Sequence, residues 1–135
     1  PRVVIDFHGP AEALTDRLTD ADGELLDAGE TDVTFRLQDS LDTPDATGVV
    51  SVTDRITGDF LLELNEAADD VLRFVRAARD YGQSTDADDG GGRYRVVLRI
   101  DGEPLTTYSK STFLVYDANG SLLRSKSLIP SGVEL

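Results

Sequence analysis

Two groups of side chains in this sequence could carry out chemistry or bind a ligand. The first contains His8, the only histidine, and Asp6, which precedes it by two residues and so shares its face of an extended strand. A carboxylate in that position could orient the imidazole for proton transfer. Catalysis would also need a nucleophile or a second acid–base group, and the sequence places neither. An exposed strand histidine is therefore the simpler interpretation.

The second group is a run of arginines, Arg73, Arg76 and Arg79, at intervals of three residues in a predicted helix. Guanidinium groups bind phosphates and carboxylates with defined geometry, so the run could meet an acidic partner. Three-residue spacing drifts around a helix, however, and Asp69 and Asp70 are near enough to pair with these arginines. A salt-bridged, solvent-facing helix is the alternative. We retain both groups as candidate binding residues and assign no catalytic residue.

The sequence predicts neither a metal nor a cofactor. It has no cysteine, which excludes thiol catalysis and cysteine-ligated metals. Asp86, Asp88 and Asp89 precede three glycines, but a calcium loop starting at Asp86 would need a ligand at its twelfth position, which is Val97. The same glycines lack the helix and lysine of a phosphate-binding loop. We therefore interpret residues 83–92 as a flexible acidic loop, and we favour a binding protein over an enzyme.

The apolar pattern predicts the elements that would position these side chains. Alternation of apolar and polar residues indicates strands, and spacings of three and four indicate helices. A second helix is expected between a cap at Asn65 and a stop at Gly82. Asn119-Gly120 is typical of a tight hairpin turn. The expected strands cover residues 3–7, 33–37, 50–52, 60–64, 94–100, 106–109, 113–116 and 122–127, and the first helix covers residues 11–18.

These elements predict an α+β fold with two layers, in which two helices cover one face of an antiparallel sheet. The length of 135 residues suits a single domain spanning residues 1–135. The order strand, helix and three strands occurs about twice, over residues 3–64 and 60–127. We therefore expect an internal duplication, with chance similarity between acid-rich segments as the competing explanation.

The charge composition is strongly acidic and uneven. The chain has 26 acidic and 13 basic residues, with 19 Asp against 7 Glu and 11 Arg against only 2 Lys. Short carboxylates keep a protein hydrated, and molar salt screens their mutual repulsion over about 3 Å. Residues 1–70 carry 18 of the acids and 4 of the bases, whereas residues 71–135 carry 8 acids and 9 bases. The composition predicts a halophilic protein whose C-terminal half is the less repulsive surface for a partner.

Three stretches carry a family resemblance over nearly the whole chain: VVIDFHGPAEALTDRL, FRLQDSLDTPDATGVVSVTDRITGDFLLELNEAADDVLRF and STFLVYDANGSLLRSKSLIPSGVEL. They resemble a family of uncharacterised haloarchaeal proteins, classed as a domain of unknown function. The resemblance implies a halophilic archaeal source and a cytoplasmic location. It brings no activity and no catalytic residue.

Three functions remain open from the sequence. The preferred one is a non-enzymatic protein-interaction module that binds another protein, or a second copy of itself, through the C-terminal half. The alternative is a small-molecule binder or enzyme that uses His8 and Asp6. A third is an acidic mimic of nucleic acid. Direct binding of nucleic acid is disfavoured by the net charge of −13, and no stretch of about 18 apolar residues predicts a membrane span.

Overall fold

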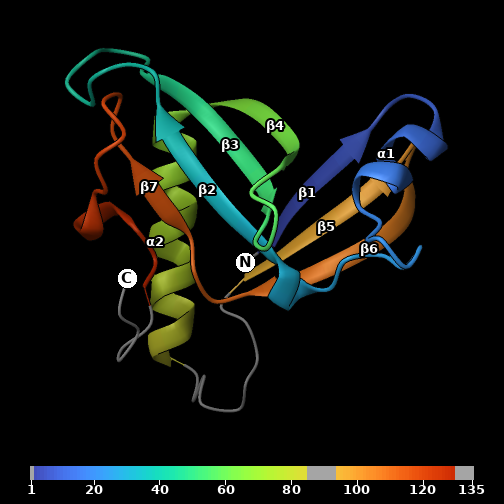
Figure 1. The fold of residues 1–135 in the computed structure, drawn as a ribbon. Coiled ribbons are helices and arrows are strands. Elements are labelled where there is room, and N and C mark those ends of the chain that lie inside the picture. The colour runs from blue at the N-terminus through green and yellow to red at the C-terminus, as the bar shows by residue number, and fades with distance from the viewer. Residues whose placement is uncertain (1, 85–93, 130–135) are drawn as a thin grey trace.

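The computed structural model describes residues 2–84 and 94–129, and the chain folds into seven strands, two α-helices and two short 3₁₀ helices over this part (Figure 1). This composition confirms the α+β class. The acidic loop predicted at residues 83–92 lies mostly outside the described residues, apart from its first two, which end the second helix. In chain order the elements are β1 (Arg2–Phe7), α1 (Ala11–Arg17), η1 (Ala28–Glu30), β2 (Thr31–Leu37), β3 (Thr47–Asp54), β4 (Phe60–Ala67), α2 (Ala68–Ser84), β5 (Tyr94–Ile100), β6 (Glu103–Lys110), β7 (Leu114–Tyr116) and η3 (Arg124–Lys126).

The strands form two sheets, where the sequence predicted a single antiparallel one. One sheet has the order β1-β5-β6 and the other has the order β4-β3-β2-β7. Each contains one parallel pairing, β1 with β5 and β2 with β7. Parallel neighbours need a long crossover, which the chain between them supplies here. Alternating apolar residues indicate that a segment is a strand, but they do not identify its partner.

The strands predicted at residues 50–52 and 60–64 form, and they pair with each other as a hairpin. Val50 lies opposite Leu64 and Val52 opposite Leu62 in the antiparallel pair of β3 and β4. The pairing continues beyond the predicted end, as far as Ala67. Asn65 is therefore a strand residue, and the prediction that it caps the second helix is wrong, because the strand ladder satisfies its backbone.

The helices occupy different parts of the molecule. In Figure 1, α2 lies behind the four-stranded sheet, whereas α1 lies at the far end of the three-stranded one. The predicted arrangement of both helices on one sheet face is thus replaced by one helix near each sheet. The inner side of α2 is held by aromatic packing, since the ring of Phe74 lies 5.4 Å from that of Tyr94 and 6.2 Å from that of Phe113.

The last predicted strand, residues 122–127, does not form. The chain turns at Gly120, with φ of 85°, and makes only isolated bridges at Leu122 and Leu128 before and after η3. Ser127 explains the difference: its hydroxyl accepts a hydrogen bond from the Val115 amide and donates one to the Leu123 carbonyl. These bonds replace a strand ladder by a local 3₁₀ turn, which lies beside α2 and completes the main candidate site.

The order of elements agrees with a duplicated unit that shares β4, but the strand pairing is not symmetrical. The first strand of the first unit, β1, pairs with β5, whereas its counterpart β4 pairs with β3. The internal duplication of residues 3–64 and 60–127 therefore stays a prediction.

Candidate functional site: a basic cleft beside helix α2

The three candidate arginines line one cleft. Its volume is about 290 Å³, and it lies between α2 and η3. Leu72 and Val75 form its apolar part, and one acidic residue, Asp69, also lines it. We call this hollow the basic cleft, and the cationic residues that line it are Arg73, Arg76, Arg79 and Lys126.

Arg79 holds the two walls of the basic cleft together. Its Nη2 atom donates hydrogen bonds to the carbonyl of Ser127 at 2.8 Å and to that of Ser125 at 3.3 Å. The helix therefore carries a donor that satisfies two carbonyls of the neighbouring turn. Since the guanidinium has five N–H donors, some remain for a ligand.

The other cations of the basic cleft are more available. Arg73 makes one ion pair, at 3.6 Å to Asp70, in which both side chains are well exposed. Such an exposed pair is worth about 0–1 kcal/mol, so a better acceptor can displace it. Arg76 and Lys126 are exposed and make no ion pair with any residue of the described chain. The cleft thus presents cations that the fold leaves without strong partners.

His8 lies in a very different setting, at an exposed corner between β1 and the turn after β5. Its Nδ1 is 3.3 Å from the Asp101 carboxylate, and its Nε2 is 3.9 Å from that of Asp6. Asp6 also accepts a hydrogen bond from the Gly102 amide, so this carboxylate stabilises the turn. The structure therefore brings His8 and Asp6 together as expected. The His8 side chain is well exposed at this corner.

A family comparison completes this description. The model of a family of unknown function, DUF5793, matches residues 1–135. The chain belongs to this family. Comparison with curated proteins and with solved structures finds no match.

Two further observations concern the described part of this DUF5793 chain. No helix among the described residues is long and apolar enough to cross a membrane. Within residues 2–84 and 94–129, no three His, Asp or Glu side chains gather closely enough to hold a metal ion.

The basic residues of the C-terminal half of this DUF5793 chain do not share one face. Lys126 lies at the basic cleft, whereas Lys110 is buried and Arg95 is exposed on β5. Tyr94, beside Arg95 on the same strand, is a core residue whose hydroxyl donates to the Thr112 carbonyl at 2.6 Å. Sequence reasoning found the three arginines of the cleft but missed Lys126 as their neighbour, because it expected a strand there. The one signal in the sequence that could have drawn attention to Lys126 is that the chain has only two lysines.

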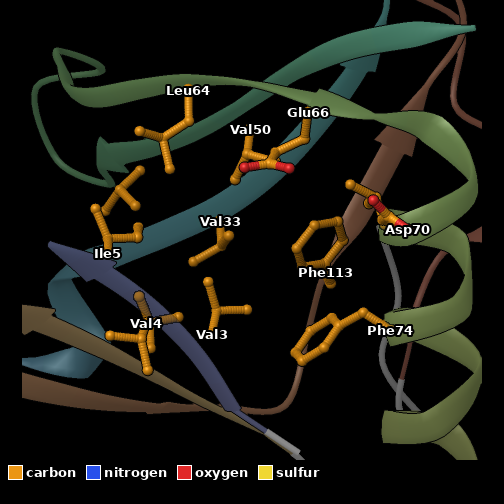
Figure 2. A pocket seen from close by; sticks show the side chains of 13 residues that line it. Val3, Val4, Ile5, Val33, Val50, Leu64, Glu66, Asp70, Phe74 and Phe113 are labelled. Carbon is orange, nitrogen blue, oxygen red and sulfur yellow. The ribbon is translucent and has the colours of Figure 1, made fainter.

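A second hollow is apolar and was not expected from the sequence. It has a volume of about 200 Å³ and lies between β1, the inner face of β2, β3 and β4, and the first turns of α2 (Figure 2). We call it the apolar cavity. Two carboxylates, those of Glu66 and Asp70, line it together with valines and the rings of Phe74 and Phe113. Helix α2 therefore separates two hollows of opposite character.

Proposed function

We propose that this protein is a non-enzymatic interaction module of a halophilic archaeal cytoplasm, and that its basic cleft takes an acidic segment of another protein. The observation that carries the proposal is the convergence of Arg73, Arg76, Arg79 and Lys126 on one cleft of a chain whose net charge is −13. Cations placed together without equal numbers of acids repel one another, so a bound anion stabilises them.

The charge of the rest of the molecule favours an acidic protein segment over nucleic acid. Nucleic-acid binding draws most of its affinity from neutralising many phosphates over an extended surface. One cleft with four cations, beside 26 acidic residues in the chain, offers little for a polyanion of that length. A short segment with one or two carboxylates fits the volume of about 290 Å³.

High salt limits the electrostatic interactions that can contribute to binding in the basic cleft. In molar salt, charges separated by more than about 3 Å are screened, so long-range attraction contributes little. Contact pairs between guanidinium and carboxylate persist better, because two parallel hydrogen bonds add to the charge. Arginine is the cation suited to this geometry, and three of the four cations of the cleft are arginines.

The halophilic part of the proposal predicts a fold that depends on salt. Self-repulsion among the acidic side chains rises as salt is removed, so the midpoint of thermal unfolding should fall between 3 M and 0.1 M KCl. Circular dichroism at 222 nm measures this midpoint. Equal midpoints at the two salt concentrations would contradict a halophilic adaptation.

The binding part is tested with a fluorescent peptide of alternating Asp and Gly, using an Asn–Gly peptide as the neutral control. In 0.5 M KCl, fluorescence anisotropy should show that the Asp peptide binds more tightly than the Asn peptide. Arg76→Glu should weaken binding of the Asp peptide by about tenfold, since it replaces an attractive cation by a repulsive acid.

Arg17→Glu is the matched control, because Arg17 is an exposed arginine on the other helix and the change in charge is the same. Its affinity should stay within about twofold of the unchanged protein, since only screened long-range repulsion is added. Equal losses in the two variants would mean that net charge, and not the basic cleft, governs binding. Failure of the Asp peptide to bind at all would also overturn the proposal.

The alternative function based on His8 and Asp6 and the nucleic-acid mimic remain predictions. The His8 corner is exposed, with 74% of the side-chain surface accessible, and this gives no protection to a reacting group. The interaction module is supported by the grouping of the three candidate arginines in one cleft.

A further inference from the structure

We propose that the apolar cavity is a second binding site, and that its ligand is a small organic amine with a compact apolar body. This inference is independent of the function proposed for the basic cleft. It rests on the volume and walls of the cavity and on the two carboxylates at one end of it.

The cavity is a gap in the packing between the two sheets. Protein interiors are normally filled to the density of organic crystals, so an open space of about 200 Å³ beside the core forfeits many contacts. Its walls include Val33, Val50 and Val52 of the inner sheet face, and Val4 of β1 is 41% exposed at the rim. An apolar ligand would restore the missing contacts.

The size of the cavity selects a small ligand. Apolar cavities of about 150 Å³ can bind a single benzene ring. A volume of about 200 Å³ therefore suits one ring or a short branched alkyl group, with room for a brief linker. The rings of Phe74 and Phe113 both line the space, and they offer edge-to-face packing to an aromatic ligand.

The two carboxylates select the charge of the ligand. Figure 2 shows Glu66 extending from β4 toward the cavity and Asp70 extending from α2 at the same end. Asp70 has structural reasons for its position, because it lies in the first turn of α2 and pairs with Arg73. Glu66 is exposed, and its carboxylate makes no ion pair with any described residue, so it is available to a ligand ammonium.

The two features together define one occupant. An apolar body fills the space between β1, the inner sheet face and Phe74, and an ammonium group at its end meets Glu66 and Asp70. An anionic ligand would meet repulsion at that end, and a neutral ligand would gain only the apolar contacts. The helix separates this amine site from the basic cleft, which takes the opposite charge.

The experiment uses three ligands of similar shape: 2-phenylethylamine, 2-phenylethanol and 3-phenylpropionate. Titrations are followed by the methyl resonances of Val3, Val33 and Val50 in two-dimensional NMR spectra of the full chain. We expect saturable shifts for the amine, with a dissociation constant on the order of 1 mM for so few atoms. The alcohol should bind about threefold more weakly, and the carboxylate more weakly still, because the two acids at the rim are exposed.

Two variants locate the charge selection. Glu66→Gln should reduce the preference for the amine over the alcohol toward unity while leaving the alcohol affinity unchanged. Glu63→Gln is the matched control: Glu63 is on the same strand but lines a hollow on the outer face of the sheet, and the preference should be kept.

A third variant tests the location of the apolar body. Val4→Trp places a large side chain at the rim, where the present residue is already partly exposed, and should weaken both amine and alcohol. Absence of saturable shifts for all three ligands would overturn the proposed site. Equal affinities for amine and alcohol, or equal effects of Glu66→Gln and Glu63→Gln, would overturn the assignment of an amine.

Discussion

The two lysines of this chain lie in opposite surroundings. Lys110, at the end of β6, has only 7% of its surface exposed, and its Nζ donates to the carbonyls of Ala28 at 2.7 Å and Thr31 at 2.5 Å. We call this place the η1–β2 junction. Lys126, in contrast, is exposed at the basic cleft. One lysine therefore has its ammonium satisfied by the backbone, while the other has its ammonium free for a partner.

The difference shows how this acidic protein uses its few basic groups. At the η1–β2 junction, burial lowers the pKa of the Lys110 ammonium from its ordinary value of 10.5, and the charge of Arg55 lowers it further. Asp32 and Asp27 oppose this change without contacting the ammonium, and Asp32 is itself paired with Arg55 at 2.6 Å. Burial of the Lys110 ammonium is therefore electrostatically unfavourable, and its two hydrogen bonds link β6 to η1 and β2. The basic cleft keeps its cations hydrated, so they cost little until a ligand removes the water.

A matched pair of substitutions gives the largest expected effect on this comparison. Lys110→Met should lower the free energy of unfolding by about 2 kcal/mol, because it removes two buried hydrogen bonds, those to the carbonyls of Ala28 and Thr31. The Ala28 carbonyl keeps the Thr31 hydroxyl as a donor at 3.2 Å, so most of the loss comes from the Thr31 carbonyl. Lys126→Met should change it by less than about 0.5 kcal/mol, as expected for an exposed residue, but it should weaken binding of the Asp–Gly peptide. Urea unfolding followed by circular dichroism measures both energies.

The opposite stability effects would contradict this contrast between Lys110 and Lys126. A stable Lys110→Met protein would mean that the Thr31 carbonyl finds another donor and that the buried ammonium is dispensable. A destabilised Lys126→Met protein would mean that the basic cleft is built for stability, as Arg79 in part is.

Local elements could be predicted from the sequence because their signals are local. The strand predicted at residues 94–100 is confirmed. It ends in a turn at Asp101 and Gly102, which both have positive φ, at 48° and 84°, as an Asp-Gly turn requires. The arginine run was recognised as a candidate site for a similar reason, because helical spacing places it on one element. Strands, helices and tight turns can be predicted in this way because their patterns lie within one short stretch of sequence.

The features that depend on partners distant in sequence could not be predicted. The parallel pairing of β1 with β5 joins Arg2 to Arg95, and no pattern within either strand indicates the other. The same holds for η3, whose position beside α2 depends on Arg79, and for the apolar cavity, which forms between the two sheets. Lys110 illustrates the limit best, since lysine is rarely buried and nothing in the residues around it indicates that its ammonium is enclosed.

The pH dependence of the Lys110→Met effect gives the smallest expected change and the most specific test of the η1–β2 junction. Because the pKa of Lys110 is lowered in the folded protein, the unfolded chain binds more protons between that lowered pKa and 10.5. The unchanged protein therefore gains stability as pH rises through this range, whereas Lys110→Met does not. The decrease in the free energy of unfolding caused by Lys110→Met should therefore be larger at pH 10 than at pH 7. The increase between the two pH values should be smaller than the decrease measured at pH 7. Tyr108, whose pKa burial raises to about 12, lowers stability above pH 10 in both proteins and cancels in the difference. A difference that shrinks with rising pH would mean that the ammonium of Lys110 is favoured by its surroundings, and the contrast with Lys126 would then be lost.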